Sequence, residues 1–456
     1  DYNTQSDVIR NIINRWSDSK KIFRSMNRVR FYHPNYPIFA DLSIVKSSAT
    51  TRNYIPIPQY TVQDANIFQN IEKYEIELEV DNTKVGLGTP YNTPKQVMAA
   101  LRKCIRIVLS GLQGTKYPIS YQEQSDILQE YMAVVHGDLL ETTTNSDPKI
   151  APPRTEKEIM DELKQNPRKI TTSDFIGPSS FTLQIGNVIP YNDKYTIPNI
   201  REHFTVTDKA DGERRLLYVS SDGNIYMIDT NMNVINTGVK TSEKSLFYSV
   251  LDGEHIRHDR NGQFINLFAA FDLYFVHKKS VRELAFHPDS EQEKEDPLKF
   301  RLPLLQKFIE VLKPHSIFED IEKGEVTPKE NKHTTNFIVK CKTFKATSIS
   351  ESIQQTDATP TTPAVVIKTP QKTIFEFCSE IMSNIQDGTY EYNTDGLIFT
   401  PSNLAVGATI AGGPPSKLSK ITWSHSFKWK PPEFNTIDFL VTVKKDKTGR
   451  DEVHHI

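Results

Sequence analysis

The sequence predicts an α+β protein with more than one domain. Three observations lead to this expectation: runs of alternating polar and apolar residues, helix starts with clear capping signals between them, and a length of 456 residues of which 37% are hydrophobic. A chain of this length is longer than one hydrophobic core normally serves, so two or three domains are expected.

Composition narrows the class of protein. The net charge is −2, so any nucleic-acid contact must come from local basic patches. Cys104, Cys341 and Cys378 lie far apart without a C-x-x-C spacing, which favours a reducing compartment and argues against a disulfide framework or a zinc site. No apolar run reaches the length of a membrane span, so we expect no membrane partner. Because the first residue is Asp1, we expect a fragment or a processed product.

Residues 1–50 are locally basic, with eight lysines and arginines against four aspartates, and they begin a region in which strands are expected. Hydrophobic spacing predicts a helix within residues 5–25, and strands are expected at 28–32 and 39–45. A further strand is expected at 74–80, where alternation puts Glu75, Glu77 and Glu79 on one face and apolar residues on the other. Three neighbouring carboxylates on a water-facing surface repel one another, so the pattern is costly unless a cation lies there. A solvated strand face is the alternative that this motif alone leaves open.

Capping signals and composition set the expected helices and domain limits. Helices are predicted at 94–112, 121–135, 155–165, 297–312 and 373–385, the third from a capping box at Thr155 and Glu158. A Thr- and Pro-rich stretch at 142–153 indicates a linker. We therefore expect domains at 1–141 and 171–456 joined by a linker and short helix at 142–170, with a mobile insertion at about 345–365.

The stretch 209–214 (KADGER) organises the second half of the chain. It lies between apolar-leaning runs at 204–207 and 216–219, so it is expected to be a tight loop between two strands. A lysine amine at Lys209 and a guanidinium at Arg214 can contact phosphate and ribose oxygens. A charged hairpin turn is the alternative for this motif alone. Four further short runs follow in order: LDGE at 251–254, FDLYF at 271–275, DGLIF at 395–399 and KWK at 428–430.

These five motifs, in this order, resemble the covalent nucleotidyltransferases, the superfamily of mRNA capping guanylyltransferases and polynucleotide ligases, over about residues 200–442. The KWKP stretch at 428–431, followed by NTIDF at 435–439, is more similar to capping guanylyltransferases than to ligases. The best match is to the multifunctional capping enzymes of large cytoplasmic DNA viruses. The resemblance implies a ligase-type, ATP-grasp-like α+β domain.

The resemblance also implies roles for individual residues. Lys209 would attack the α-phosphorus of GTP, form a lysyl-GMP phosphoramidate and release pyrophosphate, with Mg²⁺ or Mn²⁺ as cofactor. Asp395 would help place the metal, and Lys428 and Lys430 would neutralise phosphate charge and depress the pKa of Lys209. The residues expected to bind GTP are Arg214, Glu254, Phe271 and Asp438.

The upstream glutamate strand resembles the metal-binding strand of tunnel-type RNA triphosphatases, which are antiparallel β-tunnels. The resemblance implies Glu75, Glu77 and Glu79 as metal ligands, and it assigns the RNA triphosphate to Arg28, Arg30 and Lys46 with Asp41 as an acidic partner. No second E-x-E pattern precedes residue 75, so we expect this domain to be truncated at its N-terminus. Only 18 residues follow Asp438 and they contain no R-x-D-K pattern, so we expect a C-terminal OB barrel to be absent.

The function expected from these features is mRNA 5′-capping. The expected partners are GTP, the 5′-triphosphate or diphosphate end of nascent mRNA and a methyltransferase domain or subunit; the location implied by the resemblance is the host cytoplasm (viral factory) or the virion. Two alternatives stay open, an ATP-dependent RNA or DNA ligase and a non-catalytic nucleotide- or RNA-binding module. Covalent labelling with GTP or with ATP would separate them.

Overall fold

The computed structural model describes residues 6–143, 154–190, 197–290, 292–317, 337–346, 349–354, 365–370 and 372–437, together with residues 439 and 444. The chain divides into two compact units, one made of Asp1–Leu112 with Ile437–Ile456 and the other of Gln113–Thr436. The described elements combine helices with several mainly antiparallel sheets, so the α+β class expected from the sequence is confirmed. Among the helices of these ranges, none has both the length and the apolar character of a membrane span.

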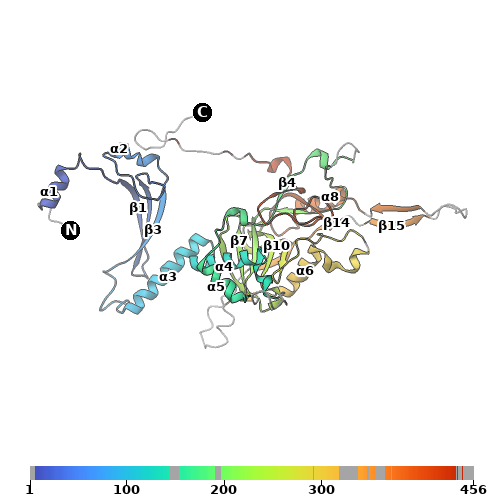
Figure 1. Cartoon of the computed structure of the whole chain (residues 1–456), viewed down its shortest axis with the longest axis horizontal. Helices are drawn as coiled ribbons and strands as arrows, with labels where there is room; N and C mark the ends of the chain where they lie inside the picture. Colours follow the sequence, from blue (N-terminus) through green and yellow to red (C-terminus); the bar gives the residue numbers. More distant parts are fainter. Residues whose placement is uncertain are drawn as a thin grey trace, which may run out of the picture. The chain divides into compact units, whose positions relative to one another are not determined.

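The first unit is built on a three-stranded antiparallel sheet (Figure 1). Its strands are, in spatial order, β1 (Arg24–Tyr32), β2 (Ile38–Ser47) and β3 (Lys73–Val80). Its helices are α1 (Asp7–Asn14), α2 (Val62–Ala65) and α3 (Pro94–Gln113), the last of which runs to the start of the second unit. The first helix is shorter than the expected segment 5–25, and Ile22 lies outside it.

In the middle of the central strand β2, the two faces of the sheet are buried in the opposite sense to the one expected. Asp41 and Ser43 of β2 are buried because charged side chains of β1 and β3 cover them. On the other face Leu42 and Ile44 are 43% and 41% exposed, and Tyr74 of β3 is 74% exposed. Alternation therefore predicted which residues share a face, but the apolar face lies open in the described part of the unit.

The second unit contains two larger sheets. The eight-stranded sheet has the order β11 (Lys279–Ser280), β10 (Phe264–Val276), β9 (Ser249–His258), β6 (Glu213–Val219), β7 (Asn224–Asp229), β8 (Val234–Lys240) and β12 (His315–Ser316), and β13 (Ile338–Cys341) pairs with β10. The five-stranded sheet has the order β14 (Lys345–Ala346), β5 (Phe204–Ala210), β17 (Thr394–Pro401), β18 (Thr422–Trp429) and β4 (Ser179–Thr182).

Residues 209–214 connect these two sheets. Lys209 lies near the end of β5, and β6 begins at Glu213 in the other sheet, so the stretch is a turn between sheets and not a hairpin between paired strands. Gly212 is needed in this turn because a Cβ there would lie 2.8 Å from the carbonyl oxygen of His255. The strand–turn–strand expectation is confirmed, and the hairpin alternative is wrong.

Helices cover both sheets. α6 (Arg301–Leu312) packs against β10, and α8 (Ile374–Gln386) packs against β5 of the five-stranded sheet (Figure 1). α4 (Tyr121–Val135) and α5 (Glu156–Gln165) share a core with β6 and β7, where the Tyr131 and Tyr218 rings meet edge to face. The compact second unit thus includes α4, whereas the first domain was expected to extend to residue 141.

Most expected helices are present, including the capping box between Thr155 and Glu158. The expected mobile insertion at about 345–365 lies partly outside the described residues. Inside it lies β15 (Ile349–Gln354), which pairs antiparallel with β16 (Val365–Pro370), a strand that begins at its end, to form a separate two-stranded sheet.

Candidate active site between the two sheets

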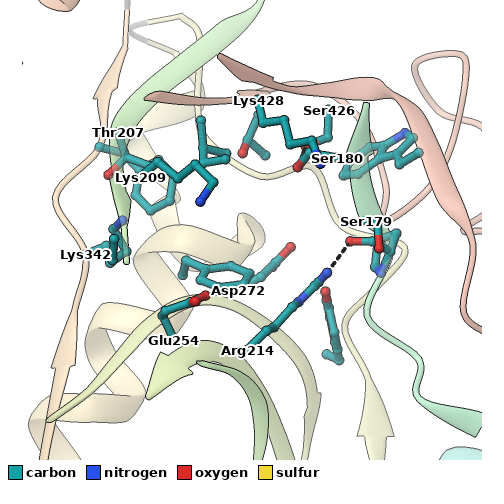
Figure 2. A pocket seen from close by; sticks show the side chains of 18 residues that line it. Ser179, Ser180, Thr207, Lys209, Arg214, Glu254, Asp272, Lys342, Ser426 and Lys428 are labelled. Atoms are coloured by element: carbon teal, nitrogen blue, oxygen red, sulfur yellow. Dashed lines mark hydrogen bonds between the residues drawn. The ribbon is translucent and has the colours of Figure 1, made fainter. Parts of the chain in front are cut away.

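A cavity of about 280 Å³ lies between the two sheets of the second unit (Figure 2). Strands β6, β9 and β10 line it from the eight-stranded sheet, and β4, β5, β17 and β18 line it from the five-stranded sheet. Five residues expected from the sequence line this cavity: Lys209, Arg214, Glu254, Phe271 and Lys428.

Lys209 enters the cavity from β5 and is held by Asp395. The Lys209 Nζ lies 2.7 Å from Asp395 Oδ1, and Lys430 Nζ lies 2.7 Å from Asp395 Oδ2. Burial works to raise the pKa of Asp395, but the hydrogen bonds and charges of the two lysines outweigh burial and hold that pKa below its usual value. An amine can attack phosphorus only as the free base, so Lys209 would have to lose one proton before it could react in this way.

The side chain of Lys428 differs from the other cations of the cavity because its amine has no ion-pair or hydrogen-bond partner in the described part of the chain. Lys209 pairs with Asp395, and Arg214 pairs with Asp252. In Figure 2 the Lys428 amine reaches toward the open space from the same side as Lys209. The unpaired charge is available to an anionic group of a ligand.

Arg214 has a different environment from the ribose contact implied by the resemblance. Its Nε and Nη2 donate to Asp252 Oδ1 and Oδ2 at 3.1 and 2.5 Å, and Nη1 donates to the Pro178 carbonyl at 2.8 Å (Figure 2). Tyr274 donates its hydroxyl to Asp252 Oδ2 at 2.5 Å. A Cβ on Gly177 would lie 2.7 Å from Arg214 Nη2, so glycine allows the backbone to approach the guanidinium. Arg214 therefore fixes the 177–178 segment to the cavity wall and keeps few donors for a ligand.

Among the described residues, Glu254 of β9 is one of the two carboxylate side chains that line the cavity, the other being Asp272. Burial raises its pKa to about 7, although the nearby charges of Lys342, Lys209 and Arg214 act in the opposite direction. Phe271 is half-buried and lines the same cavity, with the Arg214 guanidinium carbon 5.5 Å from the ring centroid. The pair offers an aromatic surface and a hydrogen-bond acceptor at one place.

Sequence reasoning missed Lys342, a buried lysine that lines the cavity. Its Nζ donates to Asp208 Oδ2 at 3.0 Å, and Asp208 precedes Lys209 in β5. The only sequence signal is that Lys342 directly follows a mostly apolar run at 337–341, and surface lysines also occur in such places. Asp438, expected near the phosphates of GTP, lies outside the described residues.

The polar face of the first unit brings together most of the residues expected there. Arg28 contacts Asp41 Oδ2 at 3.1 Å and Glu77 Oε2 at 2.6 Å, and Arg30 contacts Asp41 Oδ2 at 2.5 Å. Hydrogen bonding by Arg30 holds the pKa of Asp41 below its usual value. Oxygen atoms of Asp41, Glu77 and Glu79 lie within 4.8 Å of one another, so these three could hold a metal ion if the arginines moved aside.

Two expected residues are not part of that carboxylate cluster. Lys46 is on the opposite face of β2 by register and pairs with Glu72 at 3.5 Å, so its expected place beside Arg28 and Arg30 is wrong. Glu75 shares the face with the other glutamates but forms an ion pair with Arg24.

No family model matches the chain. The chain is similar to the probable mRNA-capping enzyme of Acanthamoeba polyphaga mimivirus, with 25% identity over 429 residues. The match covers 91% of this chain and 29% of that protein, so the chain spans less than a third of the length of this relative.

Proposed function

We propose that the second unit is a guanylyltransferase of the mRNA-capping type, in which Lys209 carries GMP from GTP to the 5′ end of an RNA. The observation that carries the proposal is the position of the Lys209 amine on a cavity that also holds Phe271, Glu254 and the unpaired Lys428. The similarity to the mimiviral protein supports capping as the process, and the five ordered motifs support a covalent lysyl route.

The chemistry follows from these positions. The lone pair of Lys209 Nζ forms a bond to the α-phosphorus of GTP, the bond from that phosphorus to the bridging oxygen breaks, and pyrophosphate leaves. An oxygen of a diphosphate-ended RNA then attacks the same phosphorus, and Lys209 is released. Lys428 and Lys430 reduce negative charge around the phosphate. A Mg²⁺ or Mn²⁺ ion held by Asp395 and phosphate oxygens would add to that neutralisation.

Labelling tests this proposal. Incubation with α-³²P-GTP and a divalent cation should label the protein through an acid-labile bond that survives denaturing electrophoresis. Lys209→Ala should remove the label, and Lys307→Ala, a change of an exposed lysine on α6, should keep it. Labelling by ATP in place of GTP would favour a polynucleotide ligase, and GTP binding without any adduct would favour a non-catalytic module.

We further propose that the first unit contributes part of an RNA 5′-triphosphatase site. The supporting observation is the cluster of Asp41, Glu77 and Glu79 beside Arg28 and Arg30. A divalent cation on the carboxylates would polarise the terminal phosphate, and the arginines would exchange carboxylate oxygens for phosphate oxygens.

Release of γ-phosphate from triphosphate-ended RNA tests this second proposal. Glu77→Ala should abolish the release and leave labelling of Lys209 intact, because Glu77 and Lys209 lie in separate compact units. Loss of both activities in a folded Glu77→Ala protein would contradict it.

A further inference from the structure

The short segment 342–344 connects the two walls of the cavity. It follows β13, which pairs with β10 of the eight-stranded sheet, and precedes β14, which pairs with β5 of the five-stranded sheet. The Lys342 amide donates to the Ala270 carbonyl at 2.8 Å, next to Phe271. The Thr343 carbonyl accepts a hydrogen bond from Thr207 Oγ1 at 2.8 Å. The segment is thus bonded to both sheets within two residues.

The side chain of Lys342 extends this connection toward the proposed nucleophile. Its Nζ donates to the main-chain carbonyl of Asp208 at 2.5 Å and to Asp208 Oδ2 at 3.0 Å. Tyr392 donates its hydroxyl to the same Oδ2 at 3.1 Å, and Thr207 Oγ1 lies 3.2 Å from Oδ1. A buried ion pair keeps its geometry only when further hydrogen bonds satisfy its remaining atoms, and these donors supply them.

We propose that Lys342 is a positioning residue that sets the distance and angle between Lys209 and a nucleotide bound against Phe271. This inference rests on the proposed function of the second unit. Lys342 bonds through its backbone to the residue before Phe271 and through its amine to the residue before Lys209. A residue bonded next to both Lys209 and Phe271 keeps the amine and the nucleotide at a fixed distance. A displacement of about 1 Å between reacting groups costs on the order of 100-fold in rate.

A comparison of three variants tests the inference: Lys342→Met, which keeps most of the aliphatic stem, Asp208→Asn, and the double variant. The measurements are the single-turnover rate of adduct formation and the dissociation constant for GTP without chemistry. Each single change should lower the rate on the order of 10- to 100-fold and leave GTP affinity within about twofold. The double variant should be no slower than the slower single variant, because both changes remove one connection.

Controls keep the outcomes distinct. Lys340→Met removes an exposed lysine two residues earlier, in β13, and should leave the rate unchanged. Tyr392→Phe removes one donor to Asp208 without touching the ion pair and should give a smaller loss of rate in a protein that folds normally.

Three results would overturn the inference. The first is weaker GTP binding by Lys342→Met at an unchanged maximal rate of adduct formation. The second is a double variant whose loss of rate equals the product of the two single losses. The third is a Lys342→Met rate equal to that of the unchanged protein. The first of these would mean that Lys342 contacts the nucleotide directly. A protein without substitutions that forms no adduct with GTP would instead overturn the proposed function, and this inference with it.

Discussion

Two ion pairs, one in each unit, differ in how far their side chains are removed from water. In the first unit Arg24 and Glu75 form an ion pair whose side chains are 45% and 36% exposed. In the second unit Asp252 is fully buried beneath Arg214, which is 22% exposed. Exposed pairs contribute about 0–1 kcal/mol, whereas removing one partner of a buried pair costs about 3–5 kcal/mol.

This difference bears on how each cluster could work. The Arg214–Asp252 pair is held inside the second unit by two hydrogen bonds and needs no rearrangement when a charged ligand arrives. Charges fixed in this way are the kind that can stabilise a transition state electrostatically. Arg24 on the first unit's sheet can exchange the Glu75 oxygen for another anion at small cost, because both side chains are partly solvated.

The largest expected effect comes from breaking the buried pair. Asp252→Asn leaves Arg214 without its bidentate partner and should lower the free energy of unfolding of the second unit by about 3–5 kcal/mol. Urea unfolding followed by tryptophan fluorescence measures this, because Trp423 and Trp429 both lie in the second unit.

The matched control is Glu310→Gln on α6, where the side chain is 68% exposed and should change stability by less than about 0.5 kcal/mol. If Asp252→Asn cost no more than the control, the buried pair would not hold the cavity wall, and the contrast between the units would fail.

An intermediate effect is expected at Glu254. Its pKa in the folded protein, about 7, lies above the 4.5 of an ordinary glutamate, so the fold favours the protonated form. Stability from this group is present below pH 4.5 and is lost as the pH rises through 7. Glu254→Gln is neutral at every pH. Its free energy of unfolding should therefore rise relative to that of the unchanged protein as the pH increases from 5 to 8, by on the order of 3 kcal/mol.

Urea unfolding at pH 5 and pH 8 measures the gain. If the two proteins differed in free energy of unfolding by the same amount at both pH values, burial would not raise the pKa of Glu254. The cavity around Glu254 would then be as well hydrated as the first unit's sheet.

Local patterns predicted much of this molecule. Period-two alternation identified the faces of β2 and β3, the capping box at Thr155 identified the start of α5, and the turn glycine at Gly212 placed Lys209 at a strand end. Each of these depends on residues close together in the chain. The ordered motifs also identified Lys209, Glu254 and Lys428, which the structure places at one cavity.

Features that depend on distant pairing could not be predicted. Lys342 lies more than 130 residues from Asp208, and nothing in its neighbours indicates that a lysine there is buried. Asp252 was visible in the LDGE motif, yet its role as the partner of Arg214 depends on the β6–β9 register. The burial of Asp41 and Ser43 could not be predicted, because alternation separates two faces without stating which one is covered.

The smallest expected effect is at the first unit's exposed pair. Glu75→Gln removes the ion pair with Arg24, and since both side chains are partly solvated the unit should lose no more than about 1 kcal/mol. Hydrogen exchange of the β2 and β3 amides at low salt measures this loss, which should shrink at high salt because mobile ions screen exposed charges. Asp41→Asn in the neighbouring strand is the internal comparison: its carboxylate is covered and accepts from both Arg28 and Arg30, so its loss should be larger and less sensitive to salt. Equal losses for the two variants would show that coverage by arginine side chains does not shield a carboxylate on this sheet, and the distinction between the two units would then be one of degree.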